Sequence, residues 1–344
     1  MGGRVEEPAP GSVATGGAPP STPGPVRRSR DVPLLVARAR DGDPRAVARL
    51  ITLVESGDTL LPEIAAALAP FAGRARVVGL TGSPGVGKST TTNELVRALR
   101  ARGHRVGVLA VDPSSPFTGG AILGDRVRMQ DHATDPGVYI RSMSSRGHLG
   151  GLSAATPQAV RVLEGAGCDV VLVETVGVGQ AEVEVASLAD TTLVLLAPGM
   201  GDAIQAVKAG ILEIADIFVV NKADRDGADA TVRDIQGNLA LGERGPGQWR
   251  PQVVRTVAAR AEGIDDLVAA LDKHRTWLVE HDELRRRREA RAAAEVEAIA
   301  LGALRARIGS LRDGTQLAAL AAKVAEGTLD PYTAADELLA QLGS

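Results

Sequence analysis

The sequence is short of cysteine, aromatic residues and long apolar runs, and each shortage excludes a class of protein. A single cysteine, Cys168, rules out an internal disulfide and fits a reducing, cytoplasmic location. Aromatic residues are 2% of the 344 residues and the net charge is −3, so no nucleic acid is expected as a partner. No apolar run approaches the roughly 20 residues that span a bilayer, so no membrane is expected either.

Residues 1–30 have almost nothing to bury, because Gly, Pro, Ser and Ala dominate them. We therefore expect a disordered tail over these residues. The tail lacks the apolar segment of a secretory signal, and Glu6 and Glu7 count against an organellar transit peptide. The full length is enough for one large domain or two.

Seven apolar runs alternate with helical patterns after residue 75, which predicts an α/β fold. The runs occupy residues 76–81, 106–112, 138–143, 169–175, 191–198, 217–224 and 251–257. Because these runs are apolar at most positions, we expect strands of a mostly parallel central sheet with helices on both faces. A helical segment at residues 31–74, with Asp43-Pro44 as a helix start, precedes this domain of residues 75–274.

The last segment, residues 275–344, is expected to form helices that join two copies of the chain. Leu301, Leu304, Ile308 and Leu311 recur every three or four residues, a narrow stripe suited to a helix–helix seam. We therefore expect a homodimer held by this C-terminal helical region. The run RRRR at 285–288 is interpreted as a solvated helix face rather than a basic patch, because glutamates are interleaved with it.

The stretch GSPGVGKS at residues 82–89 predicts a phosphate-binding loop (P-loop) rather than a plain glycine-rich turn. Its spacing matches G-x-x-x-x-G-K-[ST], in which the lysine reaches the β- and γ-phosphates and the hydroxyl binds Mg²⁺. A predicted strand precedes it and a predicted helix follows, so the helix N-terminus adds partial positive charge. The nucleotide-binding residues expected here are Gly82, Ser83, Pro84, Gly85, Val86, Gly87, Lys88, Ser89 and Thr90.

The stretch NKAD at residues 221–224 predicts recognition of guanine. Asp224 would accept hydrogen bonds from the ring N–H and the exocyclic amine of guanine, with Asn221 and Lys222 completing the pattern. Adenine presents an acceptor in place of that ring N–H, so GTP is favoured over ATP. A second base-contacting loop, which touches the guanine carbonyl through its backbone, is expected at Thr256, Val257 and Ala258.

Two acidic residues end apolar runs that we expect to lie beside the P-loop. Asp112 and Glu174, together with Ser89, are the expected ligands of Mg²⁺, which takes one or two carboxylates and keeps several waters. The alternative for Asp112 is a simple turn with Pro113. Gly177 would bring a backbone N–H to the γ-phosphate. No glutamine follows Gly177 directly to position water, so slow turnover is expected for the protein alone.

Several long stretches together resemble one known family. Besides the P-loop they are VDPSSPFTGGAILGDRVRM (111–129), RSMSSRGHLGGLS (141–153), ETVGVGQAE (174–182) and PGMGDAIQAVKAGILEIADIFVVNKAD (198–224). Over residues 31–344 the chain resembles the MeaB/ArgK-type P-loop GTPases, the methylmalonyl-CoA mutase-associated G-protein chaperones. The resemblance implies GTP and GDP as ligands, Mg²⁺ as cofactor and a homodimer joined through C-terminal helices.

The resemblance also implies a partner and a set of catalytic residues. The partner is an adenosylcobalamin-dependent acyl-CoA mutase, whose cofactor loading the GTPase gates and whose activity it protects. The catalytic set is Lys88, Asp112, Asp125 and Glu174, although the residues around Asp125 could simply start a helix. The loop at 199–208 resembles a switch that contacts the mutase.

Two other functions share parts of this pattern. A metal-insertion GTPase has the same order of strands and loops, but such proteins carry clustered Cys or His, and here only single residues such as His132, His148 and Cys168 are candidates. A small-molecule kinase would use the P-loop for phosphoryl transfer and would not need NKAD. The sequence therefore favours a GTP-hydrolysing chaperone that is slow alone and stimulated by its partner.

Overall fold

The computed structural model describes most of the chain after the first 29 residues. It describes residues 2, 30–112, 130–132, 134–144, 155–175, 181–199, 212–241, 245, 247–312 and 315–340. The predicted disordered tail at residues 1–30 lies almost wholly outside these ranges. The chain divides into two units between Asp31 and Val32, and the fold below is that of the second unit.

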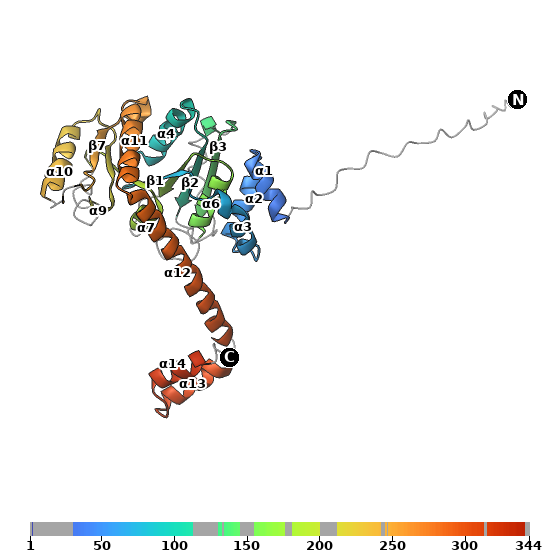
Figure 1. The fold of residues 1–344 in the computed structure, drawn as a ribbon. Coiled ribbons are helices and arrows are strands. Elements are labelled where there is room, and N and C mark those ends of the chain that lie inside the picture. Colours follow the sequence, from blue (N-terminus) through green and yellow to red (C-terminus); the bar gives the residue numbers. More distant parts are fainter. Residues whose placement is uncertain are drawn as a thin grey trace. The chain divides into compact units, whose positions relative to one another are not determined.

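Within the described residues, seven parallel strands form one sheet in the order β3-β2-β4-β1-β5-β6-β7 (Figure 1). The strands are β1 (Arg76–Thr81), β2 (Val106–Asp112), β3 (Val138–Ser144), β4 (Val170–Thr175), β5 (Thr191–Leu196), β6 (Ile217–Val220) and β7 (Gln252–Arg255). All seven predicted strands and the α/β fold class are confirmed. The last three strands end earlier than their apolar runs, so NKAD and Thr256-Val257-Ala258 follow strands instead of closing them.

Helices cover both faces of the sheet, which is why the strands are apolar throughout. On one face, α4 (Lys88–Ala101) and α11 (Ile264–Glu280) pack on side chains such as Val78 and Leu80. On the other face, α6 (Thr156–Gly165) and α7 (Ala181–Leu188) pack on side chains such as Val77, and α10 (Ala228–Leu241) covers Phe218. Successive β1 residues thus enter opposite cores, as strand geometry requires.

The N-terminal segment is helical, as predicted, and packs beside α6. It comprises α1 (Val32–Arg40), α2 (Pro44–Glu55), α3 (Leu61–Leu68) and the 3₁₀ helix η1 (Ala69–Phe71). Asp43 caps α2, because its carboxylate accepts the backbone N–H of Arg45 at 2.8 Å and Pro44 occupies the first helical position. The buried faces of α1–α3 share one apolar core with α6 and with β2–β4.

Three further helices form the C-terminal region: α12 (Glu283–Arg312), α13 (Thr315–Ala325) and α14 (Pro331–Ala340). The remaining short elements are η2 (Gln130–His132), α9 (Leu212–Ile214) and η4 (Ala258–Arg260). Residue 275, the expected start of this region, lies inside α11, which ends at Glu280. None of the helices in the described ranges is both long and apolar enough to cross a membrane.

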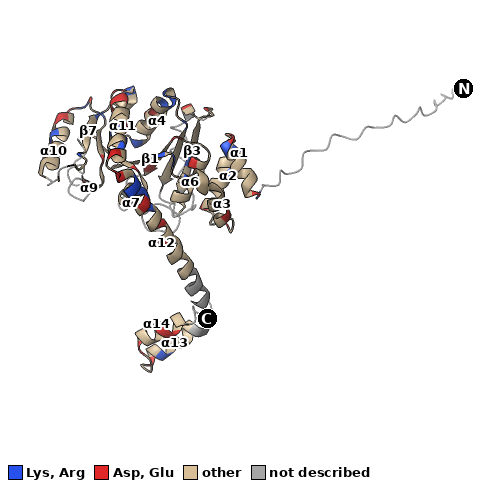
Figure 2. Cartoon of the chain, in the orientation of Figure 1, with Lys and Arg blue, Asp and Glu red and all other residues tan. Residues whose placement is uncertain are grey.

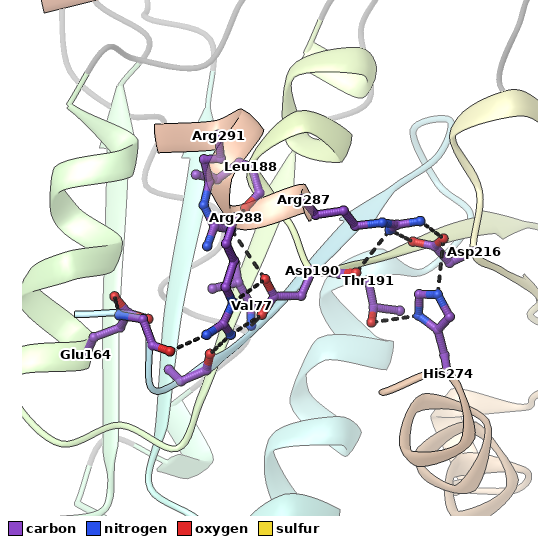
Figure 3. A network of polar contacts seen from close by, with 12 residues as sticks. Val77, Glu164, Leu188, Asp190, Thr191, Asp216, His274, Arg287, Arg288 and Arg291 are labelled. Atoms are coloured by element: carbon purple, nitrogen blue, oxygen red, sulfur yellow. Dashed lines mark hydrogen bonds and ion pairs between the residues drawn. The ribbon is translucent and has the colours of Figure 1, made fainter. Parts of the chain in front are cut away.

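The arginine run at the start of α12, coloured blue in Figure 2, is not simply a solvated face, and this corrects the interpretation made from the sequence. Arg287 donates twice to the carboxylate of Asp216 at 2.9 Å, and Arg288 donates to Asp190 at 2.8 Å (Figure 3). The side chains of Asp190 and Asp216 are 1% and 7% exposed. The two residues directly precede β5 and β6. Interleaved glutamates could not reveal this, because the acceptors lie far away in the sequence.

Two leucines of the predicted dimer stripe lie on the surface of α12. Leu301 and Leu304 are 45% and 46% exposed. Val296 and Ile299 on the same helix are also exposed. Helix α12 therefore has apolar side chains that are exposed to solvent in the single chain. The side chains of Ile308 and Leu311 lie outside the described residues.

Candidate functional site

The predicted site residues that the structure describes gather at the carboxyl edge of the sheet, where open parallel sheets bind ligands. The P-loop connects β1 to α4, and β4, which carries Glu174, lies next to β1. Leu80 of β1 pairs with Glu174, so Glu174 is level with a residue two positions before the start of the P-loop at Gly82. Strands β6 and β7 bring NKAD and Thr256 to the same edge, beyond β5.

The P-loop backbone has the conformation that its glycines predict. Gly82 has φ +139°, and a Cβ there would lie 2.2 Å from the carbonyl oxygen of Leu195 on β5. Gly87 has φ +98° at the start of α4, and a Cβ there would lie 2.3 Å from the side-chain nitrogen of Asn221. A side chain at Gly82 would therefore collide with β5, and a side chain at Gly87 would collide with Asn221.

Lys88 turns its ammonium back into the P-loop. Its Nζ donates to the carbonyl oxygens of Gly82 at 2.6 Å and Ser83 at 3.1 Å, and the residue is 7% exposed. A cation held inside the loop is placed to contact phosphate oxygens that the loop would surround. The location of Lys88 thus fits its predicted role.

Glu174 links β4 to the first turn of α4. Ser89 donates its hydroxyl proton to one carboxylate oxygen at 2.6 Å, and the hydroxyl of Thr92 lies 2.9 Å from the other. All three residues are at most 8% exposed. A serine hydroxyl beside a carboxylate is a hard-oxygen donor set of the type that Mg²⁺ prefers, so these residues fit the predicted metal.

Thr92 was missed by the sequence prediction. The signal was available, because the threonine run that follows Ser89 places residue 92 one turn further along α4. The Thr92 hydroxyl also lies 3.0 Å from the carbonyl oxygen of Lys88. Thr92 therefore holds the second oxygen of Glu174 from the helix that carries the P-loop lysine.

The residues predicted to read the base are tied to the P-loop by their own side chains. Asn221 donates to the carbonyl of Val86 at 2.8 Å, and Lys222 donates to the carbonyl of Gly85 at 2.6 Å. The side-chain oxygen of Asn221 accepts from the hydroxyl of Thr256 at 3.1 Å and from the backbone N–H of Ala258 at 3.0 Å. One amide thus fixes the P-loop, NKAD and the predicted second base loop relative to one another.

A cavity of about 220 Å³ lies beside these loops. Its walls include Asp224, Thr256, Val257 and Arg260. Asp224 is therefore placed at the cavity as the guanine prediction requires. Arg260, which the sequence prediction did not include, donates to the Asp224 carboxylate at 3.2 Å.

Some predicted residues cannot be placed in the site. Asp112 ends β2 beside β4, but its side chain is outside the described residues. Asp125 and Gly177 are outside them entirely, as are residues 200–208 of the loop that resembles a switch. Cys168 is a buried core residue, and burial raises the pKa of its thiol to about 12.

Comparison with known proteins identifies the family to which this arrangement corresponds. The family model described as "Methylmalonyl Co-A mutase-associated GTPase MeaB" matches residues 47–312. A putative GTPase of Pyrococcus abyssi is 47% identical over 315 residues, covering 90% of this chain and 96% of that protein. The mitochondrial methylmalonic aciduria type A homolog of Mus musculus is 38% identical over 269 residues, covering 72% of this chain and 64% of that protein.

A solved structure has the same fold over nearly the whole chain. The crystal structure of an LAO/AO transport system kinase superposes with a TM-score of 0.68 at 28% identity. The match covers 91% of this chain and 98% of that one.

Proposed function

Since the chain belongs to the MeaB family of methylmalonyl-CoA mutase-associated GTPases, we propose that it is the chaperone of a B12-dependent acyl-CoA mutase. Hydrolysis of GTP to GDP and phosphate is its activity, in common with relatives named as GTPases. In the proposed function, the nucleotide gates loading of adenosylcobalamin and protects the mutase. Methylmalonyl-CoA mutase is the proposed partner, because the family description names it and the mouse relative is named for methylmalonic aciduria.

The observation that carries the nucleotide assignment is the double role of Asn221. Its amide nitrogen binds the P-loop carbonyl of Val86, while its amide oxygen holds the loop at Thr256 and Ala258. Phosphate binding and base reading therefore share one buried side chain, which is 3% exposed. This linkage supports a site that holds a whole guanine nucleotide rather than a phosphate alone.

The proposed division of labour follows from the contacts at the P-loop. Lys88 binds the β- and γ-phosphates and stabilises the charge that develops on them during phosphoryl transfer. Ser89, Glu174 and Asp112 would hold Mg²⁺, which neutralises phosphate charge when it is bound. Thr92 keeps the Glu174 carboxylate turned toward Ser89, because it contacts the oxygen that Ser89 does not. Asp125 is proposed to belong, with Asp112 and Glu174, to the acidic set around the metal and the attacking water, and Gly177 to bring a backbone N–H to the γ-phosphate.

Coupling to the mutase is tested by measuring GTP hydrolysis with and without methylmalonyl-CoA mutase. We expect at least tenfold stimulation, because a partner that prefers the hydrolysis-competent state raises its population. Lys208→Ala, in the loop predicted to contact the mutase, should weaken stimulation and leave basal turnover near wild type. Lys88→Ala is the inactive control. Unchanged hydrolysis at saturating mutase would contradict the proposed coupling.

The metal-insertion and kinase alternatives find less support. Among the described residues, no group of three His, Cys, Asp or Glu side chains is arranged to hold a metal ion. The similar solved structure is titled as a kinase, but a kinase that uses ATP would not need the Asp224 carboxylate of N-K-x-D in its base pocket. The mutase chaperone therefore remains the function that we propose.

A further inference from the structure

We propose that Arg260 is a specificity-determining residue that positions Asp224 in the guanine pocket. This inference rests on the proposed role of Asp224 in reading guanine. In this arrangement, Arg260 holds the carboxylate of Asp224 toward the base, so that discrimination between guanine and adenine depends on a residue outside the N-K-x-D pattern.

Two acidic residues hold the guanidinium of Arg260 between them. The Nε of Arg260 donates to Glu262 at 2.8 Å, and Nη1 donates to Oδ2 of Asp224 at 3.2 Å. A second guanidinium nitrogen, Nη2, reaches the other carboxylate oxygen of Glu262 at 3.4 Å. The fork of the guanidinium therefore faces Glu262, and its remaining arm extends to Asp224.

The loop that carries Arg260 has a fixed and costly shape. Ala261 adopts φ +57°, a conformation that residues with a Cβ rarely take. Gly263 has φ +75°, and a Cβ there would lie 2.1 Å from the carbonyl oxygen of Arg255. Val257 and Glu262 close the loop with two backbone hydrogen bonds, at 3.0 Å and 3.3 Å. Strain of this kind persists where the surrounding structure imposes it, and this loop carries Arg260 beside the cavity that Asp224 lines.

The contact leaves Asp224 able to bind a base. A carboxylate oxygen has two lone pairs, so Oδ2 can accept from Arg260 and from a guanine N–H together. Guanine offers a ring N–H and an amino N–H, and both require the carboxylate in one orientation. By restricting rotation of that carboxylate, Arg260 removes part of the ordering cost of binding guanine. Adenine cannot donate to the same two acceptors, so fixing the carboxylate does not strengthen adenine binding.

Arg255 supplies a matched control. It lines the same cavity, and its side chain is 52% exposed, as is that of Arg260. Its guanidinium, however, pairs with Asp229 at 2.5 Å rather than with Asp224. Substituting Arg255 removes the same charge from the same cavity and leaves Asp224 untouched.

The test compares Arg260→Ala with Arg255→Ala by calorimetry with GDP and ADP. Because exposed ion pairs contribute little, we expect Arg260→Ala to weaken GDP binding about three- to fivefold at low salt. ADP binding should not change, so the GDP preference falls by the same factor. The difference from wild type should shrink between about 0.05 M and 0.5 M salt. Arg255→Ala should change GDP affinity less than Arg260→Ala does and should leave the preference for GDP over ADP as in the wild type, because it does not touch the Asp224 carboxylate.

Two further variants separate this role from a general charge effect. Glu262→Gln should also weaken GDP binding, because it loosens the anchor of Arg260. In an Asp224→Asn background, Arg260→Ala should have no effect on GDP binding, since no carboxylate remains to be positioned. Equal GDP affinity of the Arg260 and Arg255 variants, or an effect that persists without Asp224, would overturn the inference. Equal binding of GDP and ADP by the wild type would instead overturn the guanine assignment itself.

Discussion

The hydroxyl of Ser89 donates to the carboxylate of Glu174 across 2.6 Å, joining the first turn of α4 to the end of β4. The two residues are 85 positions apart in the chain, and the parallel pairing of β1 with β4 brings them together. Both groups belong to the proposed Mg²⁺ site. Their contact gives the nucleotide site an acidic centre at its phosphate end.

Glu174→Gln should lower GTP turnover by about 10²-fold, because it removes a charge that stabilises the proposed metal site. GDP binding should be largely spared, since the base pocket is built from other strands. Thr92→Val should have a smaller effect of the same kind. Thr91→Val is its control, because the Thr91 hydroxyl donates to the backbone carbonyl of Gly87 instead. Normal turnover by Glu174→Gln, measured by phosphate release, would mean that the carboxylate is only structural.

Asp224→Asn should move base preference from guanine toward xanthine. The new amide can donate to the extra carbonyl of xanthine, whereas it loses one of the two acceptors for guanine. We expect GDP affinity to fall and XDP affinity to rise, as measured by competition for the same site. A variant that keeps full GDP preference would show that Asp224 does not read the base.

Arg287→Ala should destabilise the fold by about 2–3 kcal/mol, because it leaves the Asp216 carboxylate without a principal partner in the interior. This loss of stability is smaller than for a fully buried ion pair, because the Arg287 side chain is 30% exposed. Arg286→Ala is the matched neighbour: it is 66% exposed, and its ion pair with Glu283 spans 3.6 Å. We expect at most about 0.5 kcal/mol there. Similar denaturation midpoints for the two variants would contradict an anchoring role for Arg287.

Below pH 6.5, stability should depend on His274. Burial lowers the pKa of this side chain to about 4. The positive charges of Arg287 and Arg76 lower it further, whereas the negative charge of Asp216 raises it. The unfolded chain therefore binds a proton at higher pH than the folded chain, so the stabilising contribution is lost as pH falls from about 6.5 to 4. The full contribution is about 3 kcal/mol.

His274→Gln should flatten the fall in unfolding free energy between pH 7 and about 5, as followed by denaturant titration. Thr191 remains as a hydrogen-bond partner for the new amide, because its hydroxyl lies 2.9 Å from Nδ1 of His274. An unchanged slope in the variant would assign the acid sensitivity to the carboxylates instead.

Leu301→Glu and Leu304→Glu should convert the expected homodimer into monomers. Both side chains are exposed on α12, so the substitutions should not disturb the fold of one chain. Ala303→Glu is the control, because residue 303 lies about 130° around the helix axis from the midpoint of the two leucines. Light scattering measures the mass of each variant. Point substitutions are preferable to removing α12, because its arginines anchor Asp190 and Asp216. A dimer in both leucine variants would refute the seam.

The sequence alone determined the local structure and indicated most of the candidate site. Seven apolar runs became seven strands, because burial on both faces requires continuous apolar residues and leaves a clear pattern. The P-loop and NKAD were identifiable because phosphate and guanine binding need particular residues at fixed short spacings. In each case the physical constraint acts between residues close together in the chain.

Only the tertiary structure decided the contacts that join distant residues. Nothing near Asn221 in the sequence indicates that its amide binds Val86, or that Arg260 reaches Asp224 through a strained turn. The arginines of α12 looked solvated because their partners, Asp190 and Asp216, lie about 70 to 100 residues earlier. Such pairings depend on strand order, which sets which loops meet at each edge of the sheet. Local patterns do not encode that order, because it is chosen by the packing of the whole sheet.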